Sequence, residues 1–218
     1  MKIAIVFGSS GLVGQQLVNK LIQNHSYQKI KLFVRKKPNI QNPKIEIIET
    51  TFDNPELLST KIKGDDCFFC IGTTKKNSPN NLEYKRIELD LPKKIAHLAK
   101  RNGVQSFIFI SSGYANSKSS GDYLRYKGLV EEELIYLKFK NLGILRPSFL
   151  VGSRKVKRIG ELIGISIFQV LSPLMIGPLK KIRPIQVESV ANAMIKIAQL
   201  SLKQVIFESD EIVKLNQN

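Results

Sequence analysis

The chain has 218 residues, of which 43% are hydrophobic, so it is long enough to bury one sizeable core. Two cysteines are too few for a disulfide framework and favour a reducing compartment, so we expect a cytoplasmic protein. The net charge of +16 raises the question of nucleic-acid binding, but the basic residues are spread along the chain without an aromatic-rich motif. This spread favours a solvated basic surface.

The first half of the chain alternates strand and helix patterns. Residues 2–7 are apolar after Lys2 and lead directly into glycines without a cleavage site, which predicts a first strand and not a signal peptide. Residues 12–23 have the periodicity of an amphipathic helix, and residues 31–35 and 45–48 are predicted strands. The short apolar run at residues 66–71 is typical of a buried parallel strand.

The second half continues this alternation. A long helix is predicted over residues 82–101, then a strand over 106–110, a helix over 122–137 with Asp122 as its N-cap, and a strand over 143–145. Strands separated by helices predict a Rossmann-type α/β fold, in which helices cover both faces of a doubly wound parallel sheet. We expect one domain over residues 1–218.

Residues 153–182 differ in composition from the rest of the chain. They are first basic, then apolar, then broken by prolines, which predicts a small helical lid inserted near the C-terminal third. The longest apolar stretch, residues 159–179, contains Glu161, Gln169, Pro173 and Pro178, so we expect no transmembrane helix.

The turn after the first strand has the spacing G-x-x-G-x-x-G, with glycines at 8, 11 and 14. Gly8 suits a tight turn, Gly11 allows the backbone to approach a pyrophosphate, and Gly14 allows the helix to pack on the strand. The N-terminus of the following helix offers free amide hydrogens to phosphate oxygens. The turn therefore predicts dinucleotide binding.

The end of the second predicted strand bears on cofactor choice. Sites that prefer NAD usually place Asp or Glu about 20 residues after the glycines, where the carboxylate binds the ribose hydroxyls. This chain has Arg35, followed by Lys36 and Lys37. A guanidinium binds a 2′-phosphate through charge-assisted hydrogen bonds, so we favour NADP(H), with NAD(H) as the alternative.

A Ser–Tyr–Lys constellation follows the strand at residues 106–110. Ser112 comes at the carboxyl end of that strand, and Tyr123 and Lys127 lie four residues apart on one face of the next predicted helix. A nearby ammonium favours the phenolate form of a tyrosine. Tyr123 is therefore the candidate acid/base for interconverting a carbonyl compound and an alcohol, with Ser112 hydrogen-bonding the same substrate oxygen.

With these motifs the chain resembles the atypical branch of the short-chain dehydrogenase/reductase superfamily over nearly its whole length. The resemblance also rests on Cys-Ile-Gly-Thr-Thr at residues 70–74, on Leu-Arg-Pro at 145–147 and on Arg-Pro-Ile at 183–185 before a last long helix. It implies a Rossmann sheet, NADP(H) binding and a catalytic triad of Ser112, Tyr123 and Lys127. Many members place an Asn on the helix before the Ser strand, where residues 86–90 of this chain offer only Glu88 and Asp90.

The glycine turn and the resemblance together define the residues that we expect along the cofactor. They are Gly8, Ser10, Gly11, Leu12, Val13, Gly14, Arg35, Lys36, Asp53, Gly72, Thr73, Thr74, Ser111, Lys127, Arg146, Pro147 and Phe149.

Two other patterns do not indicate a functional site. Cys67 and Cys70 have the spacing of a redox motif but lie in a predicted buried strand, which favours two core cysteines. His25 and His97 are far apart and lack cysteine partners, so we expect no metal site.

The leading hypothesis is an NADP(H)-dependent oxidoreductase that acts on a small carbonyl compound or alcohol. A non-catalytic NADP(H)-binding regulator or assembly factor is the main alternative, because a fold does not fix a function. A peripheral membrane protein, using the basic residues 155–158 and the apolar residues 159–176 as an interfacial helix, is a second alternative.

Overall fold

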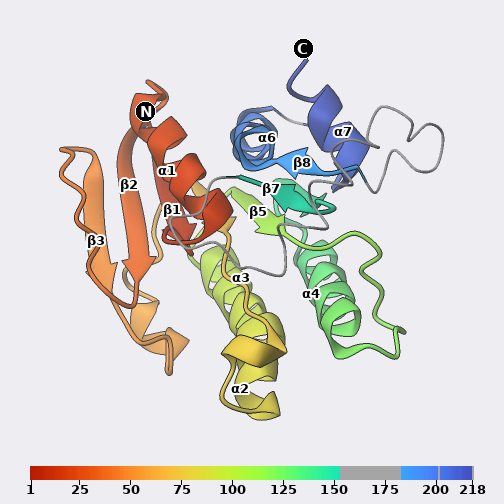
Figure 1. Cartoon of the computed structure of the whole chain (residues 1–218). Helices are drawn as coiled ribbons and strands as arrows, with labels where there is room; N and C mark the ends of the chain where they lie inside the picture. Colours follow the sequence, from red (N-terminus) through yellow and green to blue (C-terminus); the bar gives the residue numbers. More distant parts are fainter. Residues whose placement is uncertain (153–182, 201, 218) are drawn as a thin grey trace.

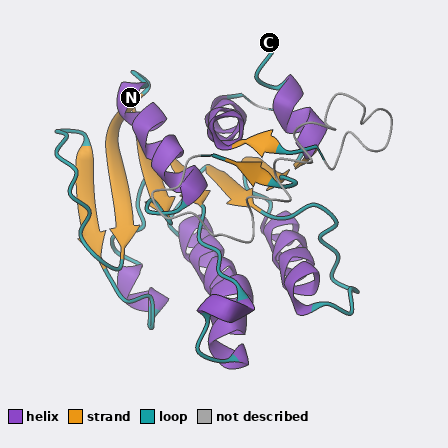
Figure 2. Ribbon diagram, viewed as in Figure 1, coloured by secondary structure: helices purple, strands orange, loops and turns teal. Residues whose placement is uncertain are grey.

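The computed structural model describes residues 1–152, 183–200 and 202–217. Its centre is a seven-stranded sheet in the order β3-β2-β1-β4-β5-β6-β9, and every pair of neighbouring strands is parallel. Figures 1 and 2 show the sheet between layers of helices. The strands are β1 (Lys2–Phe7), β2 (Tyr27–Val34), β3 (Ile45–Glu49), β4 (Asp66–Phe69), β5 (Ser106–Ile110), β6 (Asn141–Arg146) and β9 (Ile206–Glu208).

Helices cover both faces of the sheet, as Figure 1 shows. α1 (Leu12–Gln23) and α6 (Val187–Gln199) pack on one face, and α3 (Leu91–Arg101) and α4 (Asp122–Leu137) pack on the other. The alternating side chains of β1 supply both cores, because Ala4 and Val6 point to the first face and Ile5 and Phe7 to the second. This arrangement confirms the predicted Rossmann-type fold.

The predicted helix over residues 82–101 is three consecutive helical segments. They are α2 (Asn81–Lys85), the π-helical turn η3 (Arg86–Asp90) and α3. Pro92 has no N–H to donate to the carbonyl of Glu88 four residues earlier, so the regular α-helical hydrogen-bond ladder is broken at this point. The π-turn aims Glu88 inward, where its side chain is only 1% exposed.

Smaller elements complete the described chain. They are the 3-10 helices η1 (Pro55–Leu58) and η2 (Lys75–Asn77), the strand pair β7 (Leu150–Val151) and β8 (Ile185–Gln186), and α7 (Ser209–Lys214). The prediction that Asp122 caps its helix is wrong. The N-cap is Gly121, and the Asp122 carboxylate in the first turn pairs with Lys75 and Arg125. The predicted lid, residues 153–182, lies outside the described residues.

The strand order reverses between β1 and β4, and this reversal positions the site. The two strands are adjacent and in register from Ala4 opposite Asp66 to Phe7 opposite Phe69. The N–H of Cys70 donates to the carbonyl of Phe7 at 2.8 Å, so the glycine turn and the loop after β4 leave the sheet side by side. Ligands of open α/β sheets bind in the crevice at such a switch point.

Candidate functional site

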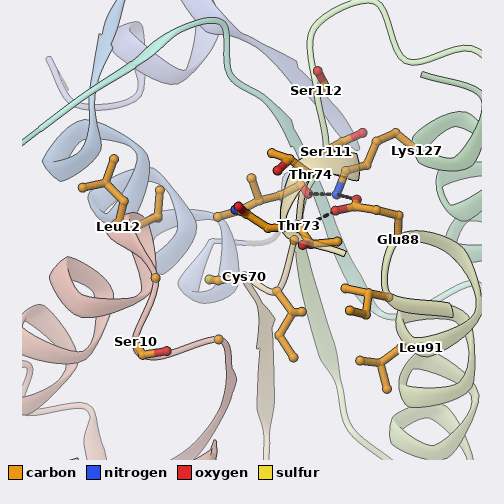
Figure 3. Close-up of a pocket in the computed structure, with 18 of the residues that line it drawn as sticks. Ser10, Leu12, Cys70, Thr73, Thr74, Glu88, Leu91, Ser111, Ser112 and Lys127 are labelled. Carbon is orange, nitrogen blue, oxygen red and sulfur yellow. Dashed lines mark hydrogen bonds and ion pairs between the residues drawn. The ribbon is translucent and has the colours of Figure 1, made fainter. Parts of the chain in front are cut away.

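A cavity of about 860 Å³ lies at the carboxyl ends of β1, β2, β4, β5 and β6. This volume is in the range of small-molecule and cofactor sites. Figure 3 shows part of its wall, with side chains from the glycine turn, from the loops after β4 and β5, and from the helices that carry Glu88, Leu91 and Lys127. Of the residues predicted for the site, the cavity wall contains Gly8, Ser10, Gly11, Leu12, Val13, Arg35, Gly72, Thr73, Thr74, Ser111, Ser112, Tyr123, Lys127, Pro147 and Phe149.

The three glycines of the first turn have separate geometric roles. Gly8 has a φ of +85°, and a Cβ there would lie 2.7 Å from the Cys70 carbonyl carbon. A Cβ on Gly14 would lie 2.1 Å from the Gly8 oxygen, so Gly14 is behind the turn and permits its packing. Gly11 is different, because its nearest backbone atom would be 3.3 Å from an added Cβ and the residue borders the cavity.

Gly11 is also the N-cap of α1, and no side chain caps this helix. The first amide hydrogens of α1 therefore have no side-chain acceptor among the described residues, and together with the helix dipole they favour an anion. The turn has the geometry of a phosphate cradle.

Substituting Gly11 with valine tests the cradle. The larger side chain meets little protein but occupies the space beside the helix N-terminus, so we expect NADPH affinity to fall by more than about 100-fold, or about 2.7 kcal/mol. Fluorescence titration of NADPH measures this loss, and circular dichroism checks that the fold survives. Binding at full affinity by the variant would place the phosphates elsewhere.

The charged side chains at the end of β2 are not equivalent. Arg35 borders the cavity, is exposed, and makes no hydrogen bond or ion pair within the described chain. Arg86 also borders the cavity, but its guanidinium is held by Glu83 at 2.6 Å and by the Phe52 carbonyl at 2.9 Å. Arg35 is therefore the cation available to an incoming anion at this end of the cavity.

Two residues that we expected near Arg35 are placed differently. Lys36 is exposed and is not part of the cavity wall among the described residues. Asp53 is also outside the wall, with its side chain 73% exposed and 3.7 Å from Arg86.

The structure brings Ser112, Tyr123 and Lys127 to the other end of the same cavity. Tyr123 is 40% exposed, and the Lys127 Nζ lies 5.9 Å from the centre of its ring. Among the described residues, the hydroxyl of Ser112 makes only a long contact, 3.3 Å, to the Gly113 carbonyl, which leaves it available to a ligand. The neighbouring Ser111 hydroxyl instead donates to Glu131 and is buried.

Lys127 has a partner that the sequence did not reveal. Its Nζ lies 3.1 Å from Oε2 of Glu88, and Figure 3 shows the two side chains meeting in the cavity wall. Burial opposes the charge of this lysine, but the Glu88 carboxylate, helped by Tyr123 and Glu131, outweighs burial and raises the pKa of Lys127. The ammonium therefore stays protonated in a nearly dry position. The signal in the sequence was that residues 86–90 offer only Glu88 and Asp90 in the region where the family resemblance implies an Asn.

Arg146 was expected beside the nicotinamide, and the structure pairs its guanidinium with two carboxylates. Its guanidinium pairs with Glu131 at 2.5 Å and with Glu208 at 3.2 Å, and it does not border the cavity within the described residues. These contacts tie β6 to α4 and to the end of β9. Pro147 and Phe149, which follow it, do border the cavity.

The two cysteines are free and form no redox pair. Cys67 is fully buried in β4, and its pKa is raised by burial and by the neighbouring Cys70 and Asp66. Cys70 borders the cavity, and burial raises the pKa of its thiol to about 12. Both thiols are therefore unreactive near neutral pH. In the described ranges, no cluster of His, Cys, Asp and Glu could hold a metal ion.

Comparison with known proteins identifies the family. Residues 8–158 match the NAD(P)H-binding family. The mitochondrial protein FMP52-1 of Scheffersomyces stipitis is 34% identical over 158 residues, or 71% of this chain and 70% of that protein. The protein HTATIP2 of Rattus norvegicus is 31% identical over 166 residues, covering 73% and 67%.

Solved structures agree on the fold. The Bordetella bronchiseptica enzyme WbmH in complex with NAD+ has a TM-score of 0.74 at 14% identity, covering 95% of this chain and 75% of that one. No helix in the part of the chain that the structure describes is long and apolar enough to cross a membrane.

The expected cytoplasmic location is wrong. The fungal relatives, from Scheffersomyces stipitis to Candida albicans, are named mitochondrial. Free cysteines indicate a reducing compartment but do not distinguish one such compartment from another, so the inference from two thiols went too far. The chain belongs to the NAD(P)H-binding family and, within the short-chain dehydrogenase/reductase superfamily, to the atypical branch.

Proposed function

We propose that the protein is an NADP(H)-dependent oxidoreductase that interconverts a carbonyl compound and an alcohol. One observation carries the proposal: a single cavity joins the glycine turn and Arg35 at one end to Ser112, Tyr123 and Lys127 at the other. An NADP(H) site needs a cradle for the pyrophosphate, a cation for the 2′-phosphate at the adenosine end, and reacting side chains at the nicotinamide end.

The residues present fit NADP(H). The uncapped N-terminus of α1 and the open approach at Gly11 suit the pyrophosphate, and the unpaired Arg35 suits a 2′-phosphate. The bound cofactor would supply the hydride equivalent, and the protein would supply the proton and the orientation.

The side chains at the reacting end have complementary roles. The Tyr123 hydroxyl would donate a proton to the carbonyl oxygen during reduction and accept one during oxidation. The Ser112 hydroxyl would hydrogen-bond the same oxygen and hold it in place. The Lys127 ammonium lies near the Tyr123 ring and would stabilise the phenolate left after proton transfer.

We expect the Arg35→Ala substitution to remove the preference for NADPH over NADH. A charge-assisted contact to phosphate contributes about 1.5–3 kcal/mol, so NADPH affinity should fall by roughly 10- to 100-fold while NADH affinity stays nearly constant. Calorimetry with both cofactors measures the change. Lys37→Ala, which removes a nearby exposed cation outside the cavity wall, is the matched control. Unchanged selectivity in Arg35→Ala would mean that Arg35 does not bind the 2′-phosphate.

The reaction itself is tested by following NADPH oxidation with a panel of aldehydes, ketones and quinones. We expect turnover with at least one class of carbonyl compound. The names of the fungal and rat relatives state no activity, so tight NADPH binding without turnover across the panel would favour the non-catalytic regulator.

A further inference from the structure

We propose that Glu88 is a positioning residue of this site, whose carboxylate fixes the Lys127 ammonium and the loop after β4 in one arrangement. The inference rests on the proposed function, because it assigns Glu88 a role toward the residues of that site. It concerns a buried carboxylate on the π-turn η3, whose side chain is only 1% exposed.

The first step is the contact of Glu88 with the loop after β4. Its Oε1 accepts a hydrogen bond from the backbone N–H of Thr73, and a Cβ on Gly72 would lie 3.4 Å from the same oxygen. Gly72 and Thr73 both border the cavity. Glu88 therefore determines where this part of the cavity wall lies.

The second step is the contact with Lys127, whose side chain is 5% exposed against 1% for that of Glu88. The other oxygen of the carboxylate, Oε2, is 3.1 Å from Nζ and makes no hydrogen bond of good geometry within the described chain. One carboxylate thus spans two elements, the loop after β4 and helix α4, through its two oxygens.

The other groups that face Lys127 do not replace this partner. Helix α4 contributes Tyr123 and Glu131 at longer range, and the Glu131 carboxylate is already engaged by Arg146. Strand β5 contributes the Ile110 carbonyl, which accepts from Nζ at 3.3 Å.

The ring of Phe109, also on β5, lies 4.9 Å from Nζ and adds a cation–π contact. None of the groups on α4 or β5 brings a free negative charge to the lysine. Without Glu88 the ammonium would lose its only ion-pair partner among the described residues while remaining buried.

The consequence follows from the balance of two opposing effects. A buried lysine without a counter-ion tends to lose its proton, because desolvation disfavours the charged form by up to several pH units. The nearby carboxylate reverses this tendency in the native protein. A neutral Lys127 would have a free lone pair and would no longer stabilise a phenolate on Tyr123.

The test is the titration of Lys127 in the full chain with ¹³C-labelled lysine, followed by the Cε chemical shift. The resonance is assigned by its absence in Lys127→Arg. In the wild-type protein we expect Lys127 to titrate above the ordinary range of a lysine, because the Glu88 carboxylate raises its pKa. In Glu88→Gln we expect a midpoint at least about 2 pH units below that of the native residue.

Two variants separate charge from shape. Glu88→Asp keeps the carboxylate, so the Lys127 midpoint in this variant should lie much closer to the wild-type midpoint than it does in Glu88→Gln. Glu133→Gln removes a carboxylate of α4 that pairs with Lys93 on the surface, and it should leave the Lys127 resonance unchanged. Equal Lys127 midpoints in Glu88→Gln and wild type would overturn the proposal.

The wild-type titration alone decides the matter if Glu88→Gln does not fold. Deprotonation of Lys127 below about pH 9 in the native protein would show that Glu88 does not hold its charge. The titration needs neither substrate nor turnover, so its failure is distinct from the failure of the proposed oxidoreductase activity.

Discussion

Replacing Tyr123 with phenylalanine is expected to lower turnover by about 10²–10⁴-fold, the usual contribution of a positioned proton donor. The substitution removes one oxygen from a side chain that is 40% exposed at the cavity, so the ring keeps its packing. NADPH affinity and stability should therefore change little. Steady-state kinetics with a substrate from the carbonyl panel measure the loss, and calorimetry measures cofactor affinity.

The controls for this result come from the same helix. Tyr136→Phe makes the same chemical change at a side chain that is 76% exposed and outside the cavity wall, and it should leave turnover unchanged. Lys127→Met should weaken both turnover and NADPH binding, whereas Ser112→Ala should lower turnover alone. Turnover by Tyr123→Phe at the wild-type rate would instead support the non-catalytic NADP(H)-binding regulator.

The architecture could be predicted because its signals are local. Strands β1, β4 and β5 are short, largely apolar runs, and the glycine spacing between β1 and α1 indicates a tight turn. Gly8 needs a positive φ and Gly14 leaves no room for a side chain, so the turn constrains those two positions sterically. Local patterns of this kind do not depend on what the rest of the chain does.

Other elements could not be predicted because they depend on distant partners. Strand β9 has three residues and exists because it pairs with β6, and β7 pairs with β8 across 33 intervening residues (185 − 151 − 1). The π-turn had a local signal in Pro92, which interrupts an otherwise helical pattern. The helical pattern predicted one continuous helix through this proline and did not reveal the π-turn that precedes it.

The candidate site also combines features that local motifs predict with features that depend on distant parts of the chain. Motifs placed Gly11, Arg35 and Tyr123 on one cavity, because the ends of parallel strands meet at one edge of the sheet. The pairing of charges was not predictable, since Glu88 and Lys127 are 39 residues apart (127 − 88). A motif gives the type of a charged side chain, and only the fold determines its partner.

For Arg146, the family resemblance predicts a cofactor ligand, whereas the structure shows a partner of two carboxylates. We expect Arg146→Met to lower the free energy of unfolding by about 3–5 kcal/mol. The change leaves the carboxylate of Glu131, whose side chain is 4% exposed, with the Ser111 hydroxyl as its remaining hydrogen-bond partner within the described chain. It also removes the contact to Glu208. Urea denaturation measures the effect as a lower midpoint at an unchanged m-value. NADPH affinity of the folded variant should be close to wild type.

Arg101→Met is the matched control, because Arg101 also pairs with a glutamate at 3.0 Å but both side chains are largely exposed, at 59% and 62%. An exposed pair contributes at most about 1 kcal/mol, so this variant should remain nearly as stable as wild type. Neutralising both partners, in Arg146→Met with Glu131→Gln, should restore part of the stability, because the buried charge is then gone. If Arg146→Met were instead as stable as the control and bound NADPH poorly, Arg146 would be a cofactor ligand, as the family resemblance implies.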